Sequence, residues 1–316
     1  MGTKFLLIGE PMGLFIAKEP GPLSDVKDFS ASVAGAEFNV AIGLKRLGHD
    51  VSFITKLGYD PNADRILSSM RQNGISDELI LRDHEKLTGF MMKNMVQDAD
   101  PEIFYYRKNS AASSVSVHDI DTLDMYGCTH LHITGIFPAV SQSAFESVKR
   151  LIGRAKNLDI FISFDPNLRP QLWKSQDEMV SSLNLIAKDA DLILPGISEG
   201  QILTGTDTAK GIADFYHDMG IKNVIVKTGK DGAYHSVKDG ISGYSPAFKV
   251  SKVVDTVGAG DGFAAGAISA LAEGLSLREA AARGNVIGAI QVTNKSDNEG
   301  LPTRSQLDEI MERGHI

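Results

Sequence analysis

The sequence predicts an α/β fold in which helices cover both faces of a central, mostly parallel β-sheet, giving three layers. The first observation is that short apolar runs alternate with amphipathic segments along most of the 316 residues, as βαβ units do. A helix between two strands returns the chain to the same edge of the sheet, so consecutive strands run parallel. The second observation is that the stretches of about 12–33 and 87–107 each contain two strand patterns joined by a turn. We expect them to form a small β-sheet lid over the carboxyl edge of the main sheet, inserted in one domain of residues 1–316.

Composition and charge narrow the range of functions. A hydrophobic fraction of 42% with 23% charged residues is typical of a soluble globular protein. The net charge of −8 and the absence of a long basic run argue against nucleic acid as a partner. No apolar stretch reaches the roughly 20 residues of a membrane span, so no membrane partner is expected. The single cysteine, Cys128, leaves no internal disulfide and fits a reducing, cytoplasmic compartment.

The first half of the chain is predicted from apolar runs and from the residues that end them. The run 4–9 is a buried strand, and Glu10 follows at its carboxyl end, where open α/β sheets bind ligands. Residues 34–48 have apolar positions at helical spacing, with Gly48 as the C-terminal cap. Asp60 is well placed to cap the next helix. The other elements expected here are strands at 51–57, 129–134 and 160–165 and helices at 61–73 and 141–155.

The second half continues the same alternation around one glycine-rich stretch. Residues 255–266 read DTVGAGDGFAAG, and the β-rich run 250–254 leads into them. A helix of small residues follows at 263–271. The remaining expected elements are strands at 191–194, 223–228, 233–237 and 241–244 and helices at 277–292 and 306–311.

The glycine-rich stretch has the features of a phosphate-binding turn. Gly258 and Gly260 lack side chains, so the backbone can turn sharply there and approach a ligand. The first turn of a helix has unsatisfied N–H donors and a partial positive charge, which together bind phosphate without a basic side chain. Asp261 lies in this turn, where it can take a proton from an alcohol that attacks the phosphate. The glycines alone are equally consistent with an ordinary strand-to-helix turn.

The longer motif is more specific. D-T-x-G-A-G-D-x-F-x-x-G resembles the C-terminal signature of the PfkB (ribokinase-like) carbohydrate kinases, and it is neither a Walker A loop nor a dinucleotide fingerprint. About 220 residues earlier, AGAEFN is similar to the family's N-terminal signature, in which Gly35 and Asn39 would hold sugar hydroxyls. The resemblance covers nearly the whole chain. It implies a ribokinase-like domain with a lid, ATP as donor, Mg²⁺, and a homo-oligomer that pairs through the lid, and it leaves the need for K⁺ open.

Two further segments resemble the 2-keto-3-deoxygluconate kinase subgroup. YYRKNSAAS implies that Tyr105 meets the substrate, and Arg107 can bind a carboxylate through two parallel hydrogen bonds. D-P-N-L-R-P-x-L-W makes Arg169 a second candidate for the substrate carboxylate or a phosphate, and Asp297 aligns with a position near the substrate. Without the resemblance, the first segment is a strand that ends in basic surface residues, and the second is a turn around Pro166.

The resemblance also implies nucleotide and metal ligands. Glu199 would act on Mg²⁺ through water, although this chain has Gly196 where the family has Asn. By position alone, Glu199 is a first-turn residue that the helix dipole favours. Small residues around Asn285 would admit an adenine ring or serve tight helix packing. The implied ATP ligands are Ser198, Thr228, Gly229, Gly232, Gly258, Gly260 and Asn285.

Together these features predict an ATP-dependent sugar kinase that acts on the terminal hydroxyl of 2-keto-3-deoxygluconate and forms its 6-phosphate. Asp261 would be the base, and the backbone of Gly258, Ala259 and Gly260 would stabilise the transferred phosphoryl group. The alternatives are a fructokinase or ribokinase, a catalytically silent sensor and, more remotely, a dehydrogenase. Arg107 and Arg169 argue against a fructokinase or ribokinase, because a neutral sugar would leave both buried guanidiniums without a charge partner.

Overall fold

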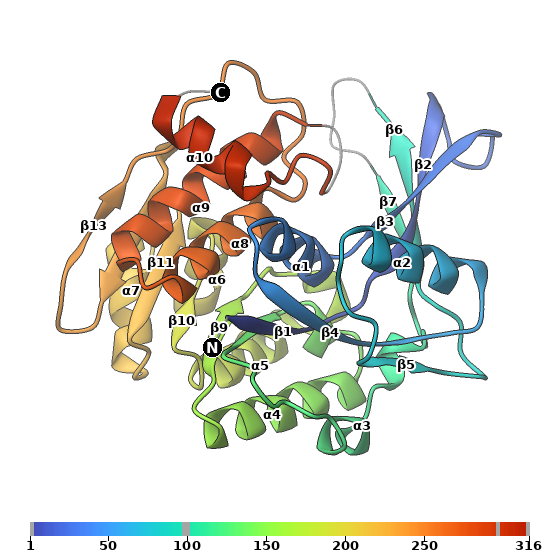
Figure 1. Ribbon diagram of the computed structural model, residues 1–316, viewed down its shortest axis with the longest axis horizontal. Helices are drawn as coiled ribbons and strands as arrows, with labels where there is room; N and C mark the ends of the chain where they lie inside the picture. The colour runs from blue at the N-terminus through green and yellow to red at the C-terminus, as the bar shows by residue number, and fades with distance from the viewer. Residues whose placement is uncertain (1–2, 97–101, 295–297, 314–316) are drawn as a thin grey trace.

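The computed structural model describes residues 3–96, 102–294 and 298–313, which contain a nine-stranded sheet and a four-stranded sheet (Figure 1). The larger sheet has the order β13-β12-β11-β10-β9-β8-β1-β4-β5. Its pairs are parallel except β11 with β12 and β12 with β13. Its strands are β1 (Lys4–Ile8), β4 (Asp50–Leu57), β5 (Ile80–Arg82), β8 (His130–Thr134), β9 (Phe161–Asp165), β10 (Leu192–Ile193), β11 (Asn223–Lys227), β12 (Ala233–Val237) and β13 (Ser242–Ser245).

Helices cover both faces of this sheet, because its strands are apolar on both sides. In β1, Phe5 and Leu7 join the core formed with α1, α2, α8 and α9, whereas Leu6 and Ile8 join the core formed with α4, α5 and α7. The predicted three-layer α/β fold is therefore confirmed. The helices are α1 (Ala36–Arg46), α2 (Pro61–Gln72), α3 (Val117–Asp121), α4 (Gln142–Asn157), α5 (Gln176–Ala187), α6 (Ile197–Thr204), α7 (Ala209–Asp218), α8 (Ala259–Ala272), α9 (Leu277–Val292) and α10 (Arg304–Arg313). None of the helices in the described part of the chain has the length and apolar character that crossing a bilayer requires.

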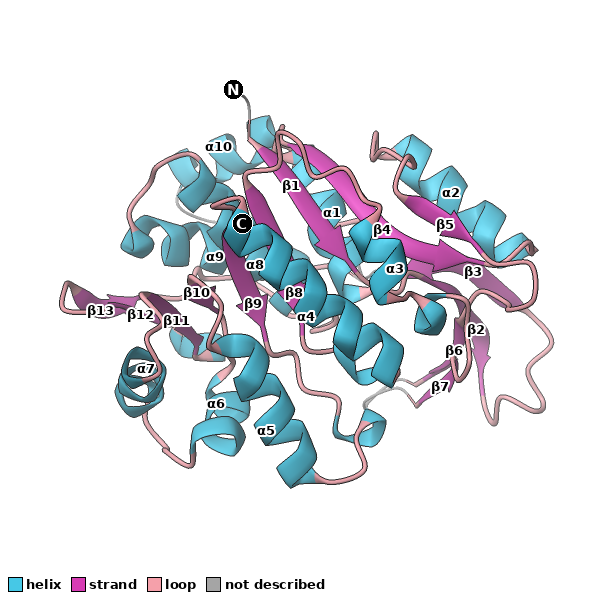
Figure 2. Cartoon of the chain, turned by 90° about the horizontal axis from the view of Figure 1, so that it is seen from below, coloured by secondary structure: helices cyan, strands magenta, loops and turns pink. Residues whose placement is uncertain are grey.

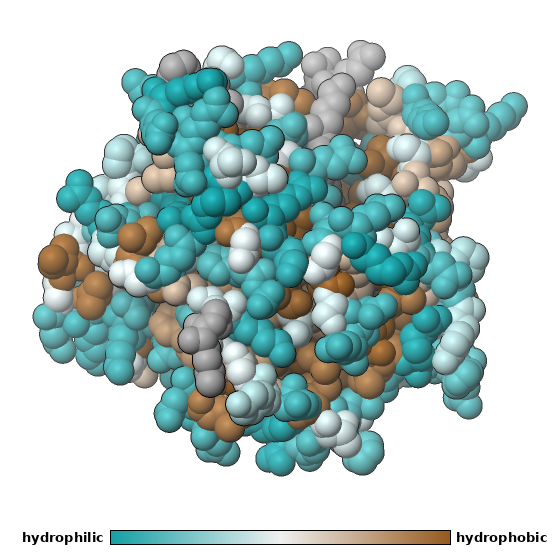
Figure 3. Space-filling model, in the orientation of Figure 1, coloured by the Kyte–Doolittle hydropathy of each residue, from teal (hydrophilic) through white to brown (hydrophobic). Residues whose placement is uncertain are grey.

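The smaller sheet is the predicted lid. Its order is β3-β2-β6-β7, with strands β2 (Met12–Pro20), β3 (Phe29–Ala34), β6 (Phe90–Met95) and β7 (Ile103–Tyr106). These strands gather at one side of the molecule, beyond the ends of β1 and β4 (Figure 2). Met12, Leu14 and Met91 form a small core on one face of the lid. Hydrophobic side chains also reach the surface over the lid and near β13 (Figure 3). Among the exposed large side chains are Phe104 in the lid and Ile241 just before β13.

Some local predictions are confirmed and one is wrong. Asp60 caps α2 by accepting hydrogen bonds from the N–H groups of Asn62 and Ala63. The β-rich run 250–254 is not a strand in the structure. Val253 is 56% exposed there, and the N–H of Val254 donates to the carbonyl of Val292 at the end of α9, 2.7 Å away. Among the residues that the structure describes, none forms a neighbouring strand that pairs with this run, so its β-branched residues do not form a strand.

Glu273, at the end of α8, connects four segments of the chain. Its carboxylate pairs with Arg283 of α9 at 2.8 Å and with Arg304 of α10, and it accepts a hydrogen bond from Ser269 at 3.0 Å. His49, in the turn before β4, lies 3.3 Å away. Burial alone would raise the pKa of Glu273, but the bonds from Arg304 and Arg283 outweigh it and hold the pKa below its usual value.

We expect Glu273→Gln to lower the free energy of unfolding by about 2 kcal/mol at pH 7, because both guanidiniums lose their charge partner. A depressed carboxyl pKa stabilises the fold above the unfolded pKa and loses this effect as the pH falls. The difference between wild type and variant should therefore shrink by pH 4, measured by urea unfolding. Glu146→Gln, which breaks an exposed pair with Lys149, is the control and should change stability little. An equal difference at both pH values would contradict the assignment.

Candidate active site

The glycine turn starts α8 as predicted. Gly258 is the N-cap and has a φ of +77°, in the left-handed region that other residues rarely adopt. The N–H of Ala259 donates back to the carbonyl of Thr256 at 3.3 Å, so this donor closes the turn. The N–H groups of Gly260 and Asp261 follow in the first helical turn, where no carbonyl of the same helix can accept them. They are the donors that the turn can offer to an anion.

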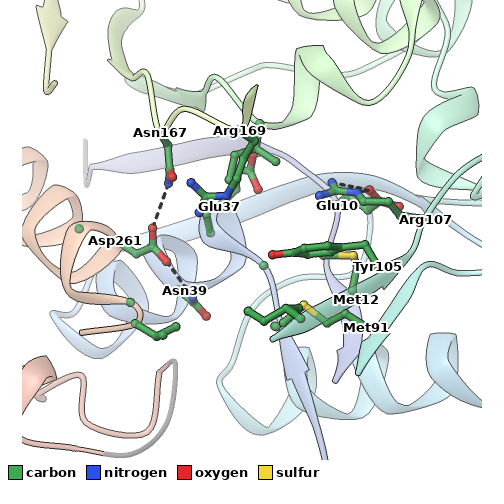
Figure 4. Close-up of a pocket in the computed structure, with 18 of the residues that line it drawn as sticks. Glu10, Met12, Glu37, Asn39, Met91, Tyr105, Arg107, Asn167, Arg169 and Asp261 are labelled. Atoms are coloured by element: carbon green, nitrogen blue, oxygen red, sulfur yellow. Dashed lines mark hydrogen bonds and ion pairs between the residues drawn. The ribbon is translucent and has the colours of Figure 1, made fainter. Parts of the chain in front are cut away.

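Asp261 is held by two side-chain amides (Figure 4). Its carboxylate is 8% exposed. The Nδ2 of Asn39 donates to one oxygen at 2.8 Å, and the Nδ2 of Asn167 donates to the other at 3.4 Å. Asn39 lies in the first turns of α1, and Asn167 follows β9. The sequence indicated Asn39 as a sugar ligand, and the structure additionally brings it against the predicted base.

The surroundings of Asp261 leave its carboxyl group able to exchange a proton near neutral pH. Burial raises the pKa of Asp261 to about 7. The hydrogen bond from Asn39 and the charge of Arg169 act against this rise, whereas the neighbouring Asp165 and Glu37 add to it. A carboxylate with a pKa close to the working pH has the property that general base catalysis requires.

A cavity of about 470 Å³ opens between this carboxylate and the lid. Five predicted substrate residues line it, namely Gly35, Asn39, Tyr105, Arg107 and Arg169, together with Gly258, Gly260 and Asp261 of the turn. The hydroxyl end of Tyr105 points into the cavity from the lid (Figure 4). A side chain on Gly35 would meet the backbone of Glu10 and Pro11 at 3.1 Å, so this wall requires glycine. Asp297, the sixth predicted substrate residue, lies outside the described residues.

Most cations in this cavity already have a carboxylate partner. The Nε and Nη2 atoms of Arg107 lie 2.7 and 2.5 Å from Oε2 of Glu10, and Ser110 hydrogen-bonds the same side chain. Lys93 of the lid lies 3.3 Å from Asp255. Among the described residues, Arg169 has no carboxylate within ion-pair distance, and its guanidinium donates to the carbonyl of Leu168 at 2.9 Å. The expectation that both arginines lack a partner without an acidic ligand is therefore wrong for Arg107.

Lys227 connects the substrate cavity with a second cavity. It ends β11 and pairs with Asp165 at 2.6 Å. Burial alone would lower the pKa of Lys227, but the charges of Asp165 and Glu199 outweigh it, so the pKa is raised and the cation persists. Lys227, Thr256 and Gly260 line both cavities. The sequence analysis missed Lys227, although a lysine that ends an otherwise apolar strand is a visible signal.

The second cavity, of about 870 Å³, has a lining that suits a nucleotide. The predicted residues Gly229, Gly232, Gly260 and Asn285 line it. Small and apolar side chains form one wall, which suits a flat aromatic ring: Phe248, Val250, Val253, Phe263, Gly288, Ala289 and Val292. The Nδ2 of Asn285 donates to the carbonyls of Ser245 and Pro246, at 3.0 Å each. Asn285 therefore shapes the wall, and its contact with ATP stays a prediction.

Three other predicted ATP ligands do not line this cavity in the described part of the chain, and one of them, Gly258, lines the substrate cavity instead. Among the residues that the structure describes, neither Ser198 nor Thr228 lines it. Ser198 is exposed in the first turn of α6. The N–H of Thr228 donates to the carbonyl of Gly232 at 2.8 Å, which closes the predicted T-G-x-x-G turn. The roles of Ser198 and Thr228 in binding ATP stay predictions.

Glu199 fits a water-mediated contact with Mg²⁺. Its Oε1 accepts from the N–H of Leu168 at 2.8 Å, and its Oε2 accepts from the N–H of Gly196 at 2.7 Å. The side chain borders the substrate cavity near Lys227. Within the described residues, no group of three or more His, Cys, Asp or Glu is arranged to hold a metal ion. Mg²⁺ keeps several waters and binds substrate phosphates with only one or two carboxylates, so a single carboxylate acting through water is compatible with it. The role of Glu199 stays a prediction.

Comparison with known proteins agrees with this geometry. The 2-dehydro-3-deoxygluconokinase of Bacillus subtilis (strain 168) is 45% identical over 302 residues, which are 95% of this chain and 92% of that protein. The crystal structure of a PfkB protein from Polaromonas sp. JS666 has a TM-score of 0.88 at 41% identity, covering 97% of this chain and 99% of that one.

A further structure, a putative ribokinase II from E. coli in complex with ATP and Mg²⁺, has a TM-score of 0.89 at 25% identity. It covers 98% of this chain and 99% of its own. These likenesses support the use of ATP and a metal. Residues 3–304 match the pfkB family carbohydrate kinase. With nearly its whole length matched, the chain belongs to the pfkB family of carbohydrate kinases, as the glycine-rich motif predicted.

Proposed function

We propose that the chain transfers the γ-phosphoryl group of ATP to the terminal hydroxyl of 2-keto-3-deoxygluconate and forms the 6-phosphate. The observation that carries the proposal is the position of Asp261. Its buried carboxylate faces the substrate cavity, and the next residue toward the N-terminus, Gly260, lines both cavities. The similarity to a 2-dehydro-3-deoxygluconokinase supports this substrate, because 2-dehydro-3-deoxygluconate is another name for 2-keto-3-deoxygluconate.

The chemistry is an in-line displacement. The hydroxyl oxygen of the sugar acid attacks the γ-phosphorus, the bond to ADP breaks, and the hydroxyl proton passes to Asp261. The N–H groups of the first turn of α8 stabilise the charge that builds on the transferred group, and Lys227 adds a positive charge where the cavities meet. Bound Mg²⁺ would neutralise phosphate charge, with Glu199 orienting one of its waters. A coupled ADP-release assay in which Na⁺ replaces K⁺ answers whether K⁺ is needed.

We assign the acid end of the substrate to Arg169, which follows β9, and to Arg107, which follows the lid strand β7. Arg169 has its charge free for the substrate carboxylate, as far as the described residues show. Arg107 has five N–H donors, of which Glu10 takes those on Nε and Nη2, so further donors remain for the substrate. The Tyr105 hydroxyl would orient a hydroxyl or keto oxygen. A neutral-sugar kinase is the second candidate, because the pairing of Arg107 with Glu10 removes one reason to require an acid.

We further propose that two copies pair through the lid and that the protein works in the cytoplasm, where ATP is available. The support is a row of aromatic side chains on the outer face of the lid. Phe90 lies between Phe15 and Tyr106, with ring centroids 6.0 and 4.5 Å apart. Phe104 and Tyr106 are 43% and 52% exposed. Clustered apolar surface of this kind marks protein interfaces.

Replacing Asp261 by Asn should lower kcat by about 10²–10⁴-fold, because the variant cannot accept the hydroxyl proton. The KM for ATP should change less than about threefold, since the backbone of the turn is retained. In the wild type, kcat/KM should fall tenfold per pH unit below about pH 7, because only ionised Asp261 is active and its pKa is raised to about 7. A coupled ADP-release assay measures both effects. Near-normal turnover by the variant would remove Asp261 from the mechanism.

Arg169→Met should raise the KM for 2-keto-3-deoxygluconate by about 30-fold, the equivalent of losing roughly 2 kcal/mol of charged hydrogen bonding. Fructose and ribose, tested in the same assay, should be poor substrates for wild type and variant alike. Arg150→Met, which breaks an exposed pair with Asp121, is the matched control. Preference for a neutral sugar together with an indifferent Arg169→Met variant would leave a sugar kinase and discard the sugar acid.

The combined change of Phe104→Glu and Tyr106→Glu should convert the wild-type oligomer to monomers, because it places charges in the proposed interface. Light scattering coupled to size exclusion measures the mass. Tyr244→Glu alters an exposed aromatic residue on β13, 62% exposed, and should leave the mass unchanged. A monomeric wild type, or an unchanged mass for the lid variant, would contradict pairing through the lid.

A further inference from the structure

We propose that Asn298 is a positioning residue for the catalytic base: its side-chain amide fixes the orientation of Asn39, so that Asn39 presents a donor to Asp261. The inference rests on the proposed function in one respect, namely that Asp261 is the base. Asn298 lies in the segment before α10, far in sequence from both other residues. Sequence motifs do not single it out.

Two hydrogen bonds connect the three side chains in series. The Nδ2 of Asn298 donates to the Oδ1 of Asn39 at 3.0 Å. The Nδ2 of Asn39 then donates to the Oδ2 of Asp261 at 2.8 Å. Asn39 is 3% exposed, so water has little access with which to replace either bond. The three residues form an amide relay that ends on the base.

The direction of the relay follows from the chemistry of its groups. An ionised carboxylate only accepts hydrogen bonds, so it requires the NH₂ end of Asn39. A side-chain amide can turn over and place its oxygen where its nitrogen was, which would set two acceptors against each other at Asp261. Asn298 opposes this turn, because its own NH₂ group would then face the NH₂ group of Asn39. With Asn298 in its observed orientation, only one of the two orientations of Asn39 satisfies both neighbours.

The segment that contains Asn298 is anchored to α1, the helix that carries Asn39. The Nη1 of Arg46, at the end of α1, donates to the backbone carbonyls of Asn298, Glu299 and Leu301 at 2.9, 3.1 and 2.7 Å. Asn39 lies two turns earlier in the same helix. The side chain of Asn298 is therefore held against α1 by backbone contacts that do not depend on its own amide. This separates the anchoring of the segment from the effect of the amide.

The amide relay matters for the pKa of Asp261. Apart from burial, most of the other groups that act on this pKa are fixed charges. Asp165 after β9 and Glu37 of α1 raise its pKa, and Arg169 lowers it. Lys227 of β11 also interacts with it. The bond from Asn167 is long, at 3.4 Å, so Asn39 supplies the stronger of the two amide contacts. Without a correctly oriented Asn39, burial would act on Asp261 with less opposition, and the base would be protonated over more of the working range.

The test is the pH dependence of kcat/KM for the sugar acid with saturating Mg-ATP, from pH 5.5 to 9, in wild type and Asn298→Leu. The substitution has similar volume and leaves the charge of the site unchanged. We expect the acid limb to move up by about 0.5–1 pH unit. This shift lowers the rate at pH 6 by about 3- to 10-fold and leaves the rate at pH 9 within about twofold of wild type. A merely structural role would lower the rate equally at all pH values.

Two comparisons isolate the amide. Arg46→Met releases the backbone of the same segment but keeps the amide of Asn298, so it should move the acid limb less than Asn298→Leu does. In an Asn39→Leu background, adding Asn298→Leu should cause no further shift, because Asn298 acts through Asn39. An unmoved limb in Asn298→Leu, or an equal shift in Arg46→Met, would overturn the proposal. Failure of the proposed function is seen separately, as an active Asp261→Asn variant or an acid that is not phosphorylated.

Discussion

The structure depends on one buried carboxylate at the start of a helix. Asp261 is removed from water, so its proton affinity is high enough for a base at neutral pH. It also lies in a turn whose backbone N–H donors can bind an anion. Both conditions come from the same short segment, because Gly258 lets the chain enter α8 through a left-handed residue and places Asp261 three positions later. The amides of Asn39 and Asn167 keep this carboxylate oriented.

Charge pairing prepares the rest of the site before any ligand binds. Lys227, Arg107 and Lys93 each have a carboxylate partner, and the pairs join the main sheet, the lid and the glycine turn. Removing a cation from water when a substrate binds costs less free energy if the cation already has a carboxylate partner. Arg169 differs in that it keeps its charge for the ligand, as far as the described residues show. If the proposed function is correct, we expect Arg169 to contribute more to the choice of an acidic substrate than the paired cations do.

Much of the fold could be predicted from the sequence, because local patterns determine local structure. The predicted helix 277–292 has the bounds of α9, and the lid strands appear where their turns indicated. The wrong strand at 250–254 shows the limit, since β-branched residues need a neighbouring strand that the sequence does not reveal. The site residues could be predicted only in segments that resemble a family motif. The contacts of Asn39 with Asp261 and of Arg107 with Glu10 join residues 222 and 97 positions apart, and only the folded chain shows them.

The central claim is that burial makes Asp261 a base matched to neutral pH, and its titration tests this most directly. The protein would be labelled with ¹³C at the side-chain carboxyl of aspartate, and the signal of Asp261 would be assigned by its absence in the Asp261→Asn variant. The account predicts that this carboxyl titrates near pH 7, well above an exposed aspartate. Titration near pH 4 would contradict it, because the carboxylate would then be too weak a base for the role that we propose.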